Sequence, residues 1–327
     1  MSTQAGIPPC PYGPADDNFH TYTDDVWETE TAWFSFHVPE RKLGGWLYGF
    51  IRPNLGICTA AVFLYDDQGF SPWEAPFYEH QVVQPIEEER DLRDFQFPTG
   101  YSLKMLEPLM HYKLFYQKDD VLTVDLDWQG IMEPHPFGHG KPPFVGASHF
   151  DQLGHVTGKL VLRGETIKVD CYSMRDRSWG PRQEQAPPSF ERLSYNHGCS
   201  RDGTGFVVIG RQTDSENASQ GTINHGFWLK NDRRIQLAAG SFKSERDPKR
   251  LWLNRIDIEA TDEEGGEHLA TVHAVSHFAW STARWVNVLT LSRWDLDGVG
   301  GWGEAHDVWQ YGQWSEALRS ARSRLKP

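Results

Sequence analysis

The chain has 327 residues, enough for two domains of ordinary size or one large one. Its composition, with 39% hydrophobic and 24% charged residues, is that of a globular protein and argues against long disorder. The excess of 45 Asp and Glu over 32 Lys and Arg gives a net charge of −13, which argues against nucleic acid and anionic lipid surfaces as partners and favours a small molecule.

The N-terminal residues lack the basic region and apolar core of a signal peptide, and no run approaches the roughly 20 apolar residues of a membrane-spanning helix. The four cysteines are scattered and form no CxxC pair, which is typical of free thiols. We therefore expect a cytoplasmic protein without an integral membrane segment.

Residues 1–24 are rich in proline and predict an extended arm. Apolar residues then alternate with polar ones at 33–38 and 46–51, on either side of a turn at 41–45, and a third strand is predicted at 57–65. This pattern indicates an antiparallel meander.

Further short strands are predicted at 79–83, 101–106, 111–118 and 121–129. Long patterns with a period of 3.6 residues are almost absent, which argues against alternating βαβ units. An all-β barrel or sandwich is the fold class that remains.

Residues 133–144 form a loop rich in Pro, Gly and His, which we expect to cover the mouth of a barrel. A metal site could be built from the histidines in and near this loop, which are His135, His139 and His149. The spacing of two His and one carboxylate that a facial triad needs is missing here, so we expect a lid and no metal.

A β-hairpin is predicted from 156–162 and 166–172, joined at Arg163 and Gly164. It leads into a charged segment, which we place in the loop after the hairpin. We expect the boundary between two domains just beyond that segment, with an N-terminal domain over 25–182 and a C-terminal domain over 183–327.

The charged segment holds Arg175, Asp176, Arg177, Trp179 and Arg182. Asp176 is the candidate catalytic carboxylate, because an arginine fork can orient it while the Trp179 indole gives it an apolar wall. Burial beside the indole would raise its pKa, and a close arginine would lower it. The alternative is a structural ion pair that joins two sheets.

The second half predicts strands at 193–199, 205–210, 223–229, 235–240, 251–260, 268–279 and 285–294. A glycine-rich segment at 298–310 carries Glu304, His306 and Asp307, and either presents an acid to a cavity or closes the last strand onto the first. Residues 315–325 predict an amphipathic helix that packs outside a sheet.

Aromatic residues are abundant, with 14 Trp, 11 Tyr and 18 Phe making up 13% of the chain. So many rings indicate broad β-surfaces, an aromatic-lined cavity, or both. The expected substrate-binding side chains are Trp46, Tyr48, Trp128, Trp179, Trp228 and Trp309.

The segment 174–182 and the hairpin before it resemble the carotenoid 1,2-hydratase and AttH-like superfamily. Its members carry an Asp-x-x-Trp-Gly element at the join of two lipocalin-like barrels, and Asp176, Trp179 and Gly180 match that element. Residues 303–309, with the sequence GEAHDVW, look like the closing motif of an uncharacterised branch. The resemblance implies two tandem lipocalin-like (calycin-type) antiparallel barrels with a short C-terminal helix.

The resemblance also implies cofactor-independent chemistry, in which a carboxylic acid protonates an alkene and water quenches the resulting cation. Asp176 would be the acid and Arg182 or Arg175 would orient it. Tyr195 or His197 would hold the attacking water or a substrate oxygen. Faces of aromatic rings suit such a cation, because their quadrupoles attract positive charge.

Two hypotheses of function follow. The first is a lyase-type enzyme, a hydratase or a cyclase/isomerase, acting on a hydrophobic isoprenoid, steroid or aromatic molecule. The second is a lipocalin-like protein that only binds a small apolar ligand, with Asp176 structural. An esterase is disfavoured because no Gly-x-Ser-x-Gly element occurs. A homodimer is compatible with both hypotheses.

Overall fold

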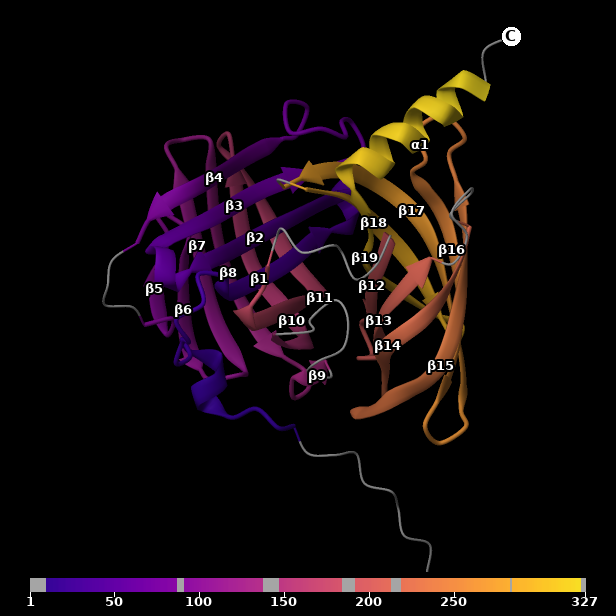
Figure 1. Cartoon of the computed structure of the whole chain (residues 1–327), viewed down its shortest axis with the longest axis horizontal. Helices are drawn as coiled ribbons and strands as arrows, with labels where there is room; N and C mark the ends of the chain where they lie inside the picture. Colours follow the sequence, from indigo (N-terminus) through magenta and orange to yellow (C-terminus); the bar gives the residue numbers. More distant parts are fainter. Residues whose placement is uncertain are drawn as a thin grey trace, which may run out of the picture.

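The computed structural model describes residues 10–86, 91–137, 147–183, 192–212, 219–282 and 284–324. These residues form two antiparallel β-units that lie side by side, the N-terminal one indigo to magenta and the C-terminal one orange to yellow in Figure 1. A single α-helix among them, α1 (Tyr311–Arg324), follows the last strand. None of the described helices is both long enough and apolar enough to span a membrane.

The N-terminal unit is an eleven-stranded sheet that curves without closing. Its strand order is β4-β3-β2-β1-β11-β10-β8-β7-β6-β5, and β9 pairs with β10. The strands are β1 (Glu28–Val38), β2 (Leu43–Arg52), β3 (Ile57–Tyr65), β4 (Phe77–Pro85), β5 (Asp94–Gln96), β6 (Ser102–Glu107), β7 (His111–Lys118), β8 (Leu122–Gly130), β9 (His135–Phe137), β10 (Ser148–Leu162) and β11 (Glu165–Pro181). The 3₁₀ helices are η1 (Pro14–Asp17), η2 (Pro39–Arg41) and η3 (Pro53–Leu55).

The C-terminal unit is a closed barrel of eight strands that pair in sequence order, with the last strand hydrogen-bonded to the first. Its strands are β12 (Arg192–Ser200), β13 (Gly205–Gln212), β14 (Gln220–Lys230), β15 (Arg233–Arg246), β16 (Leu253–Asp262), β17 (Glu267–Ser281), β18 (Trp285–Leu296) and β19 (Val299–Gln310). Helix α1 buries Trp314 and Ala321, and Trp314 packs in a cluster with Val286 and Val288 of β18.

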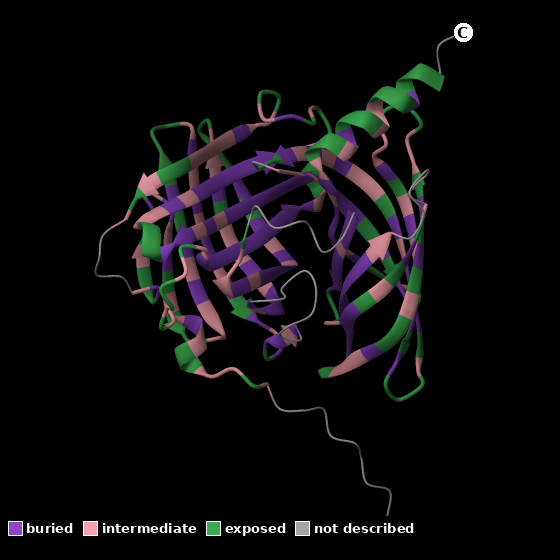
Figure 2. Ribbon diagram, in the orientation of Figure 1, coloured by how far each residue is buried: buried purple, intermediate pink, exposed green. Residues whose placement is uncertain are grey.

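Successive residues of a strand face opposite sides of the sheet, and the apolar residues therefore pack into three main cores. Phe34 of β1 packs inside the curved sheet, and Phe206 of β13 packs inside the closed barrel. The neighbouring residue Trp33 points the other way and packs with Phe227 and Leu289 of the barrel. We call this third core, between the two units, the seam. Figure 2 shows buried positions running through both units.

The all-β antiparallel class, the second barrel and the terminal helix are confirmed. The N-terminal unit differs from the expected closed barrel, because in its described residues the edge strands β4 and β5 do not pair with each other. The sheet of the N-terminal unit ends at Pro181, and the barrel begins at Arg192, so the expected boundary lies between them. The connector at 184–191 lies outside the described residues.

The predicted N-terminal arm is described from residue 10 onwards. It contains the short helix η1, whose Asp17 is 1% exposed and forms an ion pair of 3.0 Å with Arg175 of β11. This part of the arm is therefore packed onto the curved sheet. Of the predicted lid at 133–144, residues 138–144 and with them His139 lie outside the described residues, while His135 belongs to β9.

Candidate functional site

Strand β11 continues through the charged segment that the sequence places in a loop, and it ends only at Pro181. Successive residues of a strand face opposite sides of the sheet. Arg175 and Arg177 therefore point to the inside of the curved sheet, whereas Asp176 points to the seam. Arg175 and Arg177 therefore do not form the expected clamp on Asp176.

The two arginines are paired on the inner side instead. The Arg175 guanidinium is 3.0 Å from Asp17, and its Nε donates a hydrogen bond of 2.7 Å to Gln152. Arg177 Nη2 is 3.0 Å from Glu30 Oε2. All these side chains are buried, so this network is a structural ion-pair system of the kind considered as the alternative for Asp176.

Asp176 lies between Trp33 of β1 and Asp151 of β10, its cross-strand partners. The side chain is half-buried, and no group of the described residues donates a hydrogen bond to it. Burial is the main cause that raises the pKa of Asp176 to about 6, and the charge of Asp151 acts in the same direction. The charges of His149, Arg182 and Arg177 oppose this shift without reversing it.

Asp151 is a carboxylate of the opposite kind, fully buried and held by donors. Its Oδ1 accepts a hydrogen bond from the Tyr195 hydroxyl of β12, across the seam, and lies 2.9 Å from His149 Nε2. Burial, with the charge of Asp151, raises the pKa of Tyr195 well above its usual value. Tyr195 thus stays a protonated donor. Ligand atoms of His149, Asp151 and Asp176 lie within 4.8 Å of one another.

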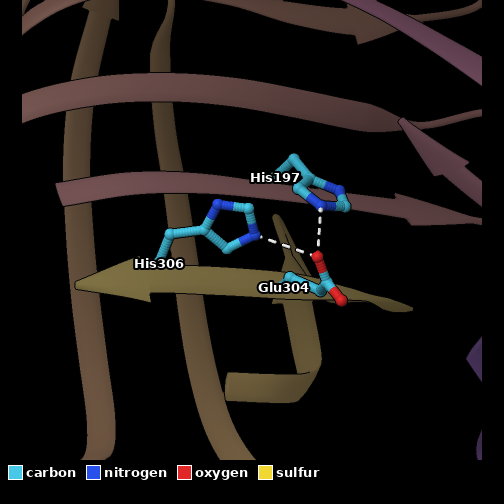
Figure 3. A group of neighbouring side chains, drawn as sticks. All are labelled: His197, Glu304 and His306. Carbon is cyan, nitrogen blue, oxygen red and sulfur yellow. Dashed lines mark hydrogen bonds and ion pairs between the residues drawn. The ribbon is translucent and has the colours of Figure 1, made fainter. Parts of the chain in front are cut away.

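A second cluster lies on the barrel side of the seam. Glu304 and His306 are two residues apart on β19 and share a face, and His197 of β12 is the cross-strand partner of Glu304. Both imidazoles point toward the Glu304 carboxylate, as Figure 3 shows. His306 Nε2 is 2.9 Å from Glu304 Oε2, and His197 Nε2 is 3.7 Å from the same oxygen.

The curved sheet supplies further donors to Glu304. The Tyr65 hydroxyl donates to Oε1, and the Trp46 indole N–H lies 2.9 and 3.1 Å from the two oxygens. Burial alone would raise the pKa of Glu304, but the interactions with His197 and His306 outweigh it and hold the pKa well below its usual value. Glu304 is therefore an ionised carboxylate in a buried place.

Trp33 lies between the two clusters. Its ring centroid is 5.4 Å from that of His306, 6.0 Å from His197 and 6.4 Å from Tyr195. It also meets Trp46, at 4.8 Å. The seam thus contains two polar clusters that share one wall of indole rings.

Three of the four predicted catalytic residues, Asp176, Tyr195 and His197, lie in the seam, although His197 belongs to the Glu304 cluster. Arg182 follows the end of β11, where its backbone N–H bonds to Trp27, and its charge reaches Asp176. The roles expected for these residues stay predictions.

The predicted aromatic lining divides between several places. Trp46 and Tyr48 pack in the seam. Trp128 is buried in the core of the curved sheet and Trp228 in the core of the barrel. Trp309 packs against Trp314 of α1, with Arg192 over its ring.

Trp179 is on the inner side of β11, away from Asp176, where it contacts Tyr12 and stacks on His20 at 4.2 Å. The expected contact between the Trp179 indole and Asp176 is therefore not formed. The seam ring placed next to Asp176 is Trp33, its cross-strand neighbour.

The described surface has hollows, and two of them are defined by the residues that line them. One is a broad groove of about 910 Å³ along α1, between Tyr311 and Ser323, and the other is a cavity of about 240 Å³ lined by His37, Lys168 and Arg201. Asp176 lines neither of them.

Sequence reasoning missed Asp151 and Trp33 altogether and considered His149 only as a possible metal ligand. A signal for Asp151 was available, because the predicted hairpin extends backward along β10 until residue 151 faces residue 176. No such signal existed for Trp33, since its pairing with Asp176 joins strands 143 residues apart.

The fold resembles those of two solved proteins. One is a putative AttH from Nitrosomonas europaea, with a TM-score of 0.55 and 12% identity over 93% of this chain and 98% of that one. The other is kievitone hydratase from Nectria haematococca, with a TM-score of 0.53 and 11% identity over 94% of each chain. At such identities the likeness concerns the fold alone.

A search of curated proteins finds no match to this sequence. A family model described as a domain of unknown function (DUF7064) matches residues 13–310, which is nearly the whole of both β-units. The chain therefore belongs to the DUF7064 family.

Proposed function

We propose that the protein is a lyase-type enzyme, a hydratase or a cyclase/isomerase, in which Asp176 acts as a carboxylic acid that protonates a carbon–carbon double bond. One observation carries the proposal. Asp176 faces the seam without a hydrogen-bond donor, and burial raises its pKa to about 6. The resemblance in fold to kievitone hydratase, a protein named for adding water, supports the reaction class.

Two neighbouring carboxyl groups take different roles in this proposal. Asp151, held by Tyr195 and near His149, is the neighbour whose charge acts on Asp176. That charge helps to keep the proton on Asp176, because two carboxylates so close together resist ionising together. Tyr195 and His149 position Asp151, and holding the attacking water or a substrate oxygen stays the role expected of Tyr195 or His197.

The reaction balances without a redox partner. The O–H bond of Asp176 breaks as a C–H bond forms on the less substituted alkene carbon, which leaves a cation on the more substituted one. In a hydratase, water then forms a C–O bond with that carbon, and its surplus proton returns to the Asp176 carboxylate. In a cyclase or isomerase, a second double bond or the loss of a neighbouring proton ends the cation instead.

The substrate class follows from the rings around the acid. Trp33 is the cross-strand neighbour of Asp176 and packs against Trp46, and the faces of such rings stabilise positive charge by about 0.5 to 2 kcal/mol each. Rings of this kind suit a hydrophobic isoprenoid, steroid or aromatic molecule with a branched alkene. Kievitone, which the name of the fold relative gives as a substrate, is the first compound to try.

The test is turnover in water labelled with oxygen-18. The protein is incubated with kievitone and with a panel of isoprenoid, steroid and aromatic alkenes, and label in the products is read by mass spectrometry, with isomers followed by chromatography. Wild type is expected to convert at least one compound. Asp176→Asn is expected to lose at least about 100-fold in rate, because general-acid catalysis contributes a factor of about 10² to 10⁴.

The matched control is Asp257→Asn, on β16 of the barrel, where the carboxylate is paired with Arg255 at the surface. It is expected to keep the wild-type rate. If the Asp176→Asn variant converts the substrate at the same rate as this control, the proposal is contradicted.

The second candidate is a protein that binds a small apolar ligand without turnover. It is favoured by the observation that Asp176 lines neither of the two hollows. The same panel distinguishes the two functions, because quenching of tryptophan fluorescence reports binding. Quenching that is equal in wild type and Asp176→Asn, with no product from either, supports the binding protein.

A further inference from the structure

We propose that His197, Glu304 and His306 bind a divalent first-row transition-metal ion in the seam. This inference is independent of the proposed function, because it concerns the barrel side of the seam and does not involve Asp176.

The strand geometry brings the three side chains to one point. Glu304 and His306 are at positions i and i+2 of β19, so both project from the same face of the barrel. His197 is directly opposite Glu304 on β12 and projects from that face as well. Two hydrogen-bonded strands therefore fix the origin of all three side chains.

The distances between the ligand atoms suit a shared ion. Bonds of about 2.0 to 2.2 Å from a tetrahedral ion to nitrogen and oxygen place neighbouring ligand atoms about 3.3 Å apart. The two nitrogens lie 2.9 and 3.7 Å from Glu304 Oε2, and all the ligand atoms are within 4.8 Å of one another. Small side-chain rotations are enough to bring them around one centre.

The environment of Glu304 is that of an oriented ligand. Tyr65 donates to Oε1, and the Trp46 N–H also binds the carboxylate, while Oε2 faces both imidazoles. Carboxylates that bind metals are commonly held by such outer hydrogen bonds. Coordination through Oε2 leaves the bond from Tyr65 intact.

His197 gives a second, independent indication of a ligand. Its side chain is fully buried, and within the described part of the chain neither ring nitrogen makes a hydrogen bond, because the nearest acceptor, Glu304 Oε2, is 3.7 Å from Nε2. Buried polar groups almost always have a partner, so an imidazole without one needs an explanation. A metal ion bound to Nε2 supplies the missing partner.

The donor set selects the kind of ion. Two imidazoles and one carboxylate are the protein ligands of several catalytic zinc sites and of non-haem iron(II) sites, which keep further positions for water or substrate. The set at His149, Asp151 and Asp176 is less suited, because it offers one imidazole and two carboxylates, of which Asp176 is only half-buried.

The experiment uses full-length protein without a histidine tag, treated with EDTA and dialysed. Titration with Co²⁺ is followed by visible absorption, and titration with Zn²⁺ by calorimetry. One equivalent of each ion is expected to bind, and Co²⁺ is expected to develop the visible bands of a site with fewer than six ligands.

Glu304→Gln and His306→Gln are expected to weaken binding by more than about 100-fold, since even outer-shell changes cost 10- to 100-fold. The control is His155→Gln, on β10, whose imidazole is 2.9 Å from Asp170 at the surface. It is expected to bind like wild type.

Two results would overturn the site. The first is that wild type takes up no stoichiometric ion. The second is that wild type, Glu304→Gln and His306→Gln bind equally, which would assign the ion to adventitious surface groups. If a variant fails to fold by circular dichroism, the wild-type Co²⁺ spectrum decides, because surface carboxylates keep the ion six-coordinate and nearly colourless.

Discussion

Asp176 and Glu304 are two carboxyl groups on facing sheets of the same seam, and their surroundings act on them in opposite ways. Glu304 is fully buried and is approached by Tyr65, Trp46, His306 and His197. Asp176 is half-buried, and no described residue donates a hydrogen bond to it. The pKa of Glu304 is therefore lowered, although the pKa of Asp176 is raised.

The comparison shows that the number of donors, rather than the depth of burial, decides which carboxyl keeps its proton. Desolvation opposes ionisation of both groups and is the largest single cause in each. Only at Glu304 do hydrogen bonds and positive charge outweigh the effect of desolvation on the pKa. One seam can therefore hold a fixed anion and a proton donor on either side of Trp33.

The largest effect is expected from Glu304→Ala. Removing this carboxylate leaves the Tyr65 and Trp46 donors and the His306 imidazole buried without it, so the free energy of unfolding is expected to fall by about 3 to 5 kcal/mol. Urea denaturation in the presence of EDTA measures this change without a contribution from bound ions.

The control for that change is Asp257→Ala. Its carboxylate forms a surface pair with Arg255, and exposed pairs contribute about 1 kcal/mol or less. If Glu304→Ala costs no more than this control, the donors around Glu304 do not hold the two units together, and the contrast between the two carboxyl groups fails.

A smaller effect, of opposite sign, is expected from Asp176→Asn. Folding raises the pKa of Asp176 from 3.8 to about 6, so ionisation costs the folded state more than the unfolded chain. The stability that this group contributes is fully present below about pH 4 and is lost as the pH rises through 6. An asparagine never ionises and avoids that loss.

Urea denaturation of wild type and Asp176→Asn at pH 4 and pH 8 measures the difference. The difference in free energy of unfolding, variant minus wild type, is expected to rise by on the order of 1 kcal/mol from pH 4 to pH 8. This figure is reduced because the side chain is partly exposed. A difference between the two proteins that is independent of pH would show that Asp176 has an ordinary pKa.

The fold class could be predicted because strand alternation and the scarcity of helical periods are local properties of the sequence. The strand at 57–65 and the strand at 111–118 are recovered with their bounds. Whether a sheet closes into a barrel is not a local property of the sequence. Whether β4 meets β5 depends on the curvature of the whole sheet, so the open N-terminal unit could not be predicted in this way.

The candidate site was predicted in part. Asp176, Tyr195 and His197 were chosen for their residue types, and they do lie in the seam. The error lay in treating 175–182 as a loop. The loop was predicted because three arginines are unusual in a strand. Continuing the alternation of the hairpin would have placed Arg175 and Arg177 opposite Asp176, whereas their partners, Asp17 and Glu30, are far away in the sequence.

The most direct test of the central claim is a titration of the Asp176 carboxyl itself, by NMR of protein with carbon-13 in its aspartate side chains. The resonance absent from the Asp176→Asn spectrum identifies the group. Its midpoint is expected near pH 6, and Asp151→Asn is expected to lower it, because the charge of Asp151 helps to raise the pKa of Asp176. A midpoint below pH 4 in the wild-type protein would contradict the assignment of Asp176 as the proton donor.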